Sequence, residues 1–266
     1  MKKLALVLMF IFVVFAGCFL FLAPKKNEFV QADVYDEIIR RGFIKVGINT
    51  DSKPFGFINK QGKVDGYDAD LSKYIAQYIL RNSNKIEFVS VTPSNRLIKA
   101  STGEVDIVVS TVTITPSRLE IVDFSIPYDI AGLSILVSSR SSIKSISDLS
   151  GKTVGVIFGT TAEKNMKTLV PNANLRGFRS YNEAYLALKQ GYIDAVTSDD
   201  TILSRFTADD DTVKLLPKRY SQEPYGIAFK QGETTKKLKE NLDFAIKDMQ
   251  QKNVINKLRR KWEIGL

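Results

Sequence analysis

The sequence TVGVIFGTT, residues 153–161, is an apolar run that passes directly into a glycine-led turn, after which a helix is predicted. A similar start, KVGI, stands at residues 45–48 and is followed by the polar segment Asn49–Ser52. Apolar β-type runs that alternate with helical patterns are typical of parallel sheets covered by helices. We therefore expect an α/β protein, and we interpret the two similar segments as the first strands of two similar lobes.

The same alternation extends along the chain on both sides of these segments. Apolar residues recur at helical spacing between Leu71 and Ile79, and Ser180 with Glu183 forms a capping box that opens a further helix. In parallel sheets, ligands bind beyond the carboxyl ends of the strands. The polar clusters that follow predicted strands are therefore candidate site segments; they lie at 49–52, 110–111, 159–161 and 198–199.

Composition excludes several classes of protein. The 266 residues are 44% hydrophobic and 25% charged, which is the composition of a globular chain. The absence of histidine removes Ser-His-Asp hydrolases and zinc sites built on His, and the single cysteine, Cys18, removes intrachain disulfides. The net charge is +9, but the basic run Arg259–Lys261 is isolated. We expect no nucleic-acid partner, no metal and no cofactor.

The three aspartates Asp65, Asp68 and Asp70 do not form a calcium-binding EF-hand loop, because the glycine and the closing Glu of that loop are missing. The family resemblance described below implies that these aspartates are structural and cap a helix that begins at Leu71.

The N-terminal segment has the pattern of an export signal. Lys2 and Lys3 precede an uncharged apolar run from Leu4 to Ala23. Within it, small residues before Cys18 resemble the lipobox of bacterial lipoproteins, which implies that Cys18 is lipidated.

Two alternatives to lipidation stay open. The run is about 20 residues, which is long enough to remain as an uncleaved membrane anchor. Alternatively, Val30-Gln31-Ala32 has the small-x-small pattern of an ordinary cleavage site, which would make the protein secreted. Each interpretation treats residues 1–32 as signal or anchor and linker, and places the rest of the chain on the outer side of the cytoplasmic membrane.

The exported part resembles the bacterial extracellular solute-binding proteins that deliver polar amino acids to ABC importers. The motifs that carry the resemblance stand in order: VGI at 46–48, GKVDGYDADL at 62–71, GEVD at 103–106, TITPSR at 113–118, DFSIPY at 123–128, LSGK at 149–152, GTTAE at 159–163, GYIDA at 191–195 and YGIAF at 225–229. The resemblance implies the two-lobed type II periplasmic-binding-protein fold, in which each lobe is a mostly parallel sheet covered by helices. It places a first part of lobe 1 at 33–130, lobe 2 at 131–226 and the return of lobe 1 at 227–266, joined by a hinge that the chain crosses twice.

The resemblance also implies a ligand site. Arg118 would bind the α-carboxylate, because a guanidinium matches a carboxylate with two hydrogen bonds. Thr160 and Thr161, at a helix start, would add donors for an anion. Asp199 would bind the ammonium, with help from the Thr113 hydroxyl and the Thr111 carbonyl.

Specificity is expected from the residues around the ligand side chain. Asn49 follows the first strand, and Ser52 and Pro93 stand where family members often carry aromatic walls. Arg96 lies in a stretch that resembles the aspartate/glutamate-binding branch, where it would reach a side-chain carboxylate. We therefore expect glutamate or aspartate as the ligand, and glutamine as the next candidate.

We expect a receptor rather than an enzyme. The lobes would close on the ligand, and the protein, a monomer, would then dock on a permease whose ATPase is a separate subunit. Two alternatives remain: a dehydratase on the same fold, with Glu163 or Glu223 as general acid, and a membrane-tethered ligand sensor.

Overall fold

The computed structural model describes residues 32–208 and 210–265. The chain divides into the units Met1–Gln31 and Ala32–Leu266, and the second unit is described below. The predictions for Cys18 and the N-terminal apolar run lie outside the described residues. Within 32–208 and 210–265, no helix has the length and apolar character needed to span a membrane.

The first sheet has the strand order β5-β1-β6-β14-β7, and β8 also pairs with β14. Its strands are β1 (Ile44–Asn49), β5 (Ile86–Val91), β6 (Ile107–Thr113), β7 (Val122–Phe124), β8 (Asp129–Ala131) and β14 (Glu223–Lys230). Strand β1 is parallel to β5 and β6, whereas β14 is antiparallel to β6, β7 and β8. We call this sheet, with its helices, lobe 1.

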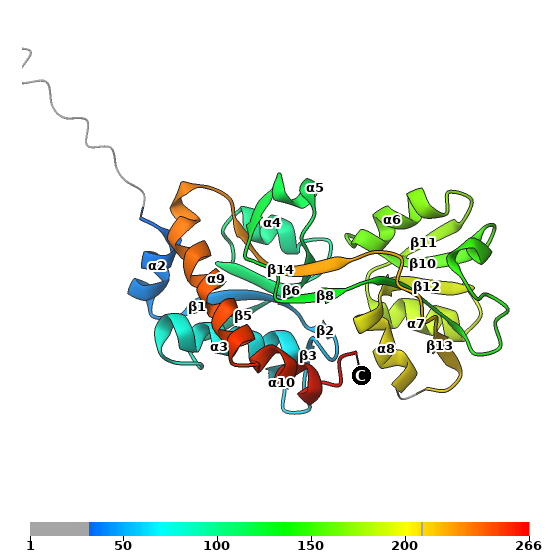
Figure 1. Ribbon diagram of the computed structural model, residues 1–266, viewed down its shortest axis with the longest axis horizontal. Coiled ribbons are helices and arrows are strands. Elements are labelled where there is room, and N and C mark those ends of the chain that lie inside the picture. The colour runs from blue at the N-terminus through cyan, green and yellow to red at the C-terminus, as the bar shows by residue number, and fades with distance from the viewer. Residues whose placement is uncertain (1–31, 209, 266) are drawn as a thin grey trace, which may run out of the picture. The chain divides into compact units, whose positions relative to one another are not determined.

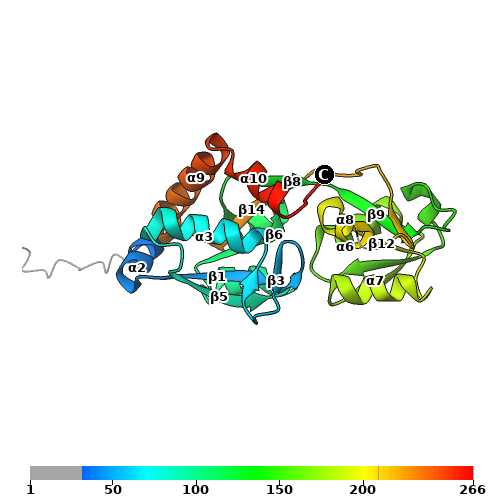
Figure 2. The ribbon, with the colours of Figure 1, turned by 90° about the horizontal axis from the view of Figure 1, so that it is seen from below.

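The helices of lobe 1 are α2 (Val34–Arg41), α3 (Tyr67–Leu80), α4 (Arg96–Ser101), α5 (Pro116–Leu119), α9 (Lys236–Gln251) and α10 (Val254–Lys261), with a 3₁₀ turn at Glu233–Thr235. Figure 2 shows α3, α9 and α10 together on one side of the sheet. Their apolar faces bury Leu71, Ile75 and Leu242 against Val46 and Ile107 of the strands. This burial is the main driving force for folding the lobe.

The second sheet has the order β11-β10-β12-β9-β13. Its strands are β9 (Leu133–Ser138), β10 (Thr153–Ile157), β11 (Asn174–Phe178), β12 (Ala195–Asp199) and β13 (Val213–Leu215). Its helices are α6 (Thr161–Leu169), α7 (Tyr181–Lys189) and α8 (Asp200–Ala208), with a 3₁₀ turn at Ile146–Leu149. We call this sheet, with its helices, lobe 2 (Figure 1).

The two lobes begin alike, as the sequence predicts. Strand β1 lies between β5 and β6 and is parallel to both, and β10 lies between β11 and β12 in the same way. Gly47 pairs with Val108, and Gly155 occupies the corresponding register opposite Val196. The interpretation of KVGI and TVGV as equivalent first strands is therefore confirmed.

The starts of α6 and α7 show why these helices begin where they do. The Thr160 hydroxyl accepts a hydrogen bond from the Glu163 N–H at 3.3 Å, and the Ser180 hydroxyl accepts one from the Glu183 N–H at 3.1 Å. Each glutamate carboxylate in turn accepts a backbone N–H that precedes the cap. Both helices therefore start with reciprocal caps, which satisfy N–H groups that have no partner within the helix.

The chain passes twice between the lobes. It leaves β8 at Ala131 and enters β9 at Leu133, and it returns from β13 to β14 at Glu223. Asp200 joins the two passages, because its carboxylate accepts the Gly132 N–H at 3.0 Å and the Arg219 Nε–H at 2.6 Å. A Cβ at Gly132 would lie 2.7 Å from the Ser221 carbonyl oxygen, so only glycine fits here.

A small third sheet, with the order β2-β3-β4, was not expected from the sequence; its strands are β2 (Asp51–Ser52), β3 (Gly56–Ile58) and β4 (Val64–Asp65). Helix α3 begins directly after it at Tyr67. The prediction that Asp68 and Asp70 cap a helix from Leu71 is therefore wrong, since both lie inside the first turn of α3. Asp70 instead binds Lys73 and Lys261, and Asp68 is buried.

Candidate functional site

Arg118 is a buried cation that faces both lobes. It lies in α5, where the Thr115 hydroxyl caps the helix by accepting the Arg118 N–H. Its Nη1 donates to the Thr113 carbonyl at 2.8 Å, and its Nη2 donates to the Gly159 carbonyl of lobe 2 at 3.1 Å. The side chain is 7% exposed, and no carboxylate of the described residues forms a salt bridge with it. Burial lowers the pKa of Arg118 to about 10, and the charge of Arg96 adds to this effect.

Arg96 is a second buried guanidinium close to the first. It is the first residue of α4 and is 3% exposed. Its Nη1 donates to the carbonyls of Ser110 and, at 3.4 Å, Thr111. Its Nε has no hydrogen-bond partner among the described residues. The side chain therefore keeps donor capacity that the lobe itself does not use.

Asp199 supplies the opposite charge from lobe 2. It is the last residue of β12, 7% exposed, and its Oδ2 accepts the Tyr225 hydroxyl at 2.5 Å. Burial raises the pKa of Asp199 to about 7, and the neighbouring Glu223 acts in the same direction, whereas the Tyr225 hydrogen bond and Arg96 lower it. A buried carboxylate without a cation partner is costly, so the site favours a cationic group next to Asp199.

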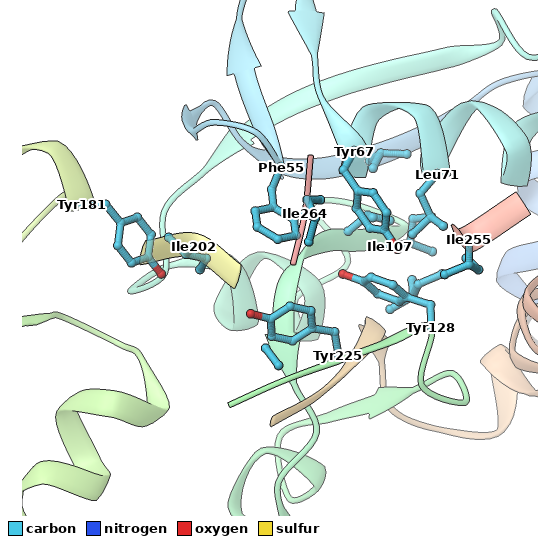
Figure 3. Close-up of a cluster of buried hydrophobic side chains, with 14 of the residues drawn as sticks. Phe55, Tyr67, Leu71, Ile107, Tyr128, Tyr181, Ile202, Tyr225, Ile255 and Ile264 are labelled. Atoms are coloured by element: carbon cyan, nitrogen blue, oxygen red, sulfur yellow. The ribbon is translucent and has the colours of Figure 1, made fainter. Parts of the chain in front are cut away.

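Tyr181 and Tyr225 lie beside the predicted site residues, and the sequence analysis did not single them out. Both are buried, and Figure 3 shows their hydroxyl ends facing one another across Ile202. Burial raises the pKa of Tyr181 to about 12; the charge of Arg96 opposes this shift and the charge of Asp199 adds to it. Nothing marks a tyrosine as a site residue in a sequence, but Tyr181 follows the Ser180 cap at a predicted helix start.

The remaining predicted residues have different positions. Thr160 is engaged in the cap of α6, and Thr161 begins that helix with part of its surface exposed. Thr113 is buried, and its carbonyl accepts the Arg118 bond. The Asn49 Oδ1 accepts the Asp51 N–H at 2.9 Å and shapes a turn, and the role of Asn49 in ligand binding stays a prediction.

Ser52 and Thr111 each have an unusual feature. The Ser52 hydroxyl is buried without a hydrogen-bond partner among the described residues. Thr111 has a φ of 45°, a left-handed conformation that is rare for a β-branched residue. Unsatisfied polar atoms and backbone outliers cluster at functional sites, so both residues support a site at this place.

The two lobes are in contact around these residues. Besides the Arg118 bond to Gly159, the Asn182 Nδ2 donates to Asp51 at 2.7 Å, and the Lys164 Nζ donates to the Ser117 hydroxyl at 3.3 Å. A Cβ on Gly159 would lie 2.5 Å from the Pro93 carbonyl oxygen, so this glycine lets the lobes approach.

Among the described residues, three cavities are lined by both lobes, and two of them adjoin predicted site residues. One, of about 270 Å³, lies between Ser52 of lobe 1 and Tyr181 of lobe 2. The other, of about 580 Å³, lies between Arg118 and the start of α6 at Thr160 and Thr161. No group of three or more acidic or cysteine side chains that could hold a metal occurs in the part of the chain that the structure describes.

Comparisons with known proteins agree with this architecture. Residues 44–265 match the model of the bacterial extracellular solute-binding proteins, family 3. The glutamine-binding protein of Geobacillus stearothermophilus is 40% identical over 194 residues, which cover 72% of this chain and 74% of that protein. The ABC transporter glutamine-binding protein GlnH of Bacillus subtilis is 36% identical, with 82% of this chain and 80% of that protein covered.

A solved structure of an amino-acid-binding protein has the same fold. The cysteine-binding protein of Campylobacter jejuni superimposes with a TM-score of 0.82 at 32% sequence identity, over 86% of this chain and 92% of that chain. The structure thus has two similar sheets, joined by two passages of the chain, with buried charges of both signs between them. The family match spans both of these lobes. The chain belongs to the bacterial extracellular solute-binding proteins of family 3 and has their two-lobed type II periplasmic-binding-protein fold.

Proposed function

We propose that this protein binds a free amino acid between its lobes, with glutamine as the preferred ligand, and delivers it to an ABC permease. One observation carries the proposal: Arg118 of lobe 1 and Asp199 of lobe 2 are both buried, and neither has an oppositely charged partner within salt-bridge distance among the described residues. A zwitterion supplies both missing charges at once, its carboxylate to Arg118 and its ammonium to Asp199.

The charge balance around the site favours an uncharged ligand side chain. The α-carboxylate of the ligand matches Arg118, and the remaining guanidinium, Arg96, already interacts electrostatically with the buried carboxyl groups of Asp68 and Asp199. A second carboxylate on the ligand would compete with these two groups for Arg96. The Nε–H of Arg96 and the hydroxyl of Ser52 are instead free for an amide.

This argument reverses the order of ligands that the sequence suggested. Glutamate and aspartate were expected first, on the basis of Arg96, but one edge of Arg96 is bound to backbone carbonyls. Two relatives that are glutamine-binding proteins support the same order. Glutamate is the second candidate, because it differs from glutamine only at the side-chain terminus.

Lobe closure follows from the division of the site. Because the ligand contacts Arg118 in lobe 1 and Asp199 in lobe 2, it binds the closed form more tightly, and this difference drives closure. We place the hinge passages near Ala131–Leu133 and just before Glu223, where β14 enters the sheet of lobe 1, rather than at the expected Pro224–Ile227. We propose that the protein closes on its ligand as a monomer.

The protein works on the outer face of the cytoplasmic membrane, tethered through a lipid on Cys18. Cells grown with a radiolabelled fatty acid should label the natural protein but not a Cys18→Ala variant. If the natural protein takes up no label, the lipid is refuted, and the uncleaved anchor replaces it in this proposal.

Binding rather than catalysis is proposed, because the two carboxyl groups considered for a dehydratase have structural roles. Glu163 caps α6, and Glu223 accepts hydrogen bonds from Ser221 and Asn165. The relatives named above are also binding proteins.

The proposal is tested by calorimetry with the purified full-length protein, stripped of ligand. Glutamine should bind, while N-acetylglutamine and the α-amide of glutamine, which each lack one of the two charges, should bind about 100-fold more weakly. Equal affinity for these analogues, or no binding of any standard amino acid, would refute the proposal. Glutamate that binds tenfold more tightly than glutamine would refute the charge-balance argument alone.

A further inference from the structure

Strand β6 contains a bulge next to the site. Gly226 of β14 pairs with Val112, but Ala228 pairs with Val108, so Val109, Ser110 and Thr111 lie opposite Ile227 alone. The backbone of Ile227 does not return to β6, since its N–H donates to the Ser125 hydroxyl and its carbonyl accepts the Ser125 N–H, each at 3.0 Å. The bulge therefore removes Ser110 and Thr111 from the ladder with β14.

The other neighbour of β6 does not pair with these two residues either. Strand β1 pairs Val46 with Ile107 and Gly47 with Val108, before the bulge begins. The buried backbone groups of Ser110 and Thr111 thus need hydrogen-bond partners from outside the sheet.

Arg96 provides those partners. Its Nη1 donates to the carbonyls of both Ser110 and Thr111, and the Thr92 N–H to Asn95 bond at 2.8 Å fixes the loop in front of its helix. Burial raises the pKa of the Asp68 carboxyl to about 7, and the charge of Arg96 opposes this shift. The contacts of Arg96 with the two carbonyls therefore hold the peptides at Ser110 and Thr111.

The conformation that is held in this way is an unfavourable one. Thr111 has a φ of 45°, and a β-branched side chain disfavours this region strongly. The conformation of Thr111 sets the direction of the residues that follow it. This direction matters for the site, because the Thr113 carbonyl, two residues further on, accepts the hydrogen bond from Arg118.

We propose that Arg96 is a positioning residue, which holds the Thr111 peptide in its left-handed conformation and thereby sets the orientation of Arg118 for the ligand carboxylate. This inference rests on the proposed function for its ligand, but the strained peptide and its contacts are independent of which amino acid binds. Arg96 acts through the backbone of β6, in addition to any contact that its free Nε–H makes.

The test is a double-mutant cycle read in the dissociation constant for glutamine. Glycine adopts a φ of 45° without strain, so in Thr111→Gly the peptide should keep this conformation without the hydrogen bonds from Arg96. The factor by which Arg96→Met weakens binding should be at least about threefold larger in the natural background than in the Thr111→Gly background, because any direct contact of Arg96 with the ligand is lost equally in both. A residue that only stabilises the fold would change the melting temperature, and the folded fraction would keep its affinity.

An equal loss in both backgrounds would overturn the inference, because a direct contact with the ligand does not depend on residue 111. Lys99→Met is the matched control, since Lys99 lies on the same helix and forms a surface salt bridge with Glu104. It should leave the dissociation constant unchanged.

A second measurement tests the strain even where Arg96→Met does not fold. At an ordinary φ, alanine is more stabilising than glycine, but at a φ of 45° the order reverses. Thr111→Gly should therefore have a higher melting temperature than Thr111→Ala, and the opposite order would overturn the inference. If the wild-type protein binds no amino acid, the proposed function fails while this comparison still decides the strain.

Discussion

Affinity for the amino acid should depend on pH through Asp199. Burial raises the pKa of this carboxyl to about 7, so it is largely protonated in the free protein below that pH. The ammonium of the ligand needs the ionised form, and a proton must therefore be released when the ligand binds in acid. Affinity should rise with pH up to the pKa and level off above it.

The expected size follows from the position of the pKa. Below about pH 7 each pH unit reduces the ionised fraction tenfold, so binding at about pH 5 should be roughly 100-fold weaker than at about pH 8. Asp199→Asn retains a carbonyl that can accept the Tyr225 hydroxyl but cannot match an ammonium. Removing one partner of a buried charge pair costs about 2–5 kcal/mol, which corresponds to a loss of about 30-fold to several thousand-fold in affinity.

The assay is calorimetric titration with glutamine between about pH 5 and pH 8, where the ligand remains a zwitterion. Glu223→Gln should move the midpoint to lower pH, because Glu223 raises the pKa of Asp199. Asp68→Asn is the control for the other carboxyl whose pKa is raised to about 7, and it should keep the slope. A wild-type affinity that is constant over this range, or an unchanged slope in Asp199→Asn, would refute the assignment of Asp199.

Three further changes test other parts of the account. Arg118→Lys should weaken glutamine binding about 10- to 100-fold, because lysine cannot form the two-bond match; calorimetry that gives a change below threefold would contradict this role. Gly132→Ala should lower the free energy of unfolding by about 1–3 kcal/mol in denaturant unfolding, because the added Cβ would lie 2.7 Å from the Ser221 carbonyl oxygen. An unchanged denaturation midpoint would contradict the need for glycine between the two passages. Asp68→Asn should raise the melting temperature more at about pH 8 than at about pH 5, because a carboxyl with a raised pKa destabilises the fold increasingly as the pH rises from its ordinary pKa of about 4 to its folded pKa of about 7; an equal or larger gain at about pH 5 would contradict the burial argument.

The alternation of strands and helices made the architecture predictable. The KVGI and TVGV segments became equivalent central strands, and the Ser180 cap was predicted correctly because a capping box is a local pattern. Arg118 and Asp199 became candidates through the resemblance of their segments to family motifs, which are also local in the sequence. Such features depend on residues that are neighbours in the sequence.

The features that the sequence did not reveal depend on distant partners. The bond between Tyr225 and Asp199 joins β14 to β12, and the left-handed Thr111 results from a register shift between β6 and β14. The turn that the Asn49 side chain closes onto Asp51 was also not expected from the sequence. Register and turn chemistry of this kind are set by packing between elements, which periodicity does not encode.

The central claim is that charges from two lobes meet on one bound zwitterion. A crystal structure of the protein grown with glutamine tests it most directly. The account predicts the α-carboxylate within hydrogen-bond distance of Arg118 and the ammonium within hydrogen-bond distance of Asp199. Glutamine bound with neither contact, or seated on one lobe alone, would contradict it.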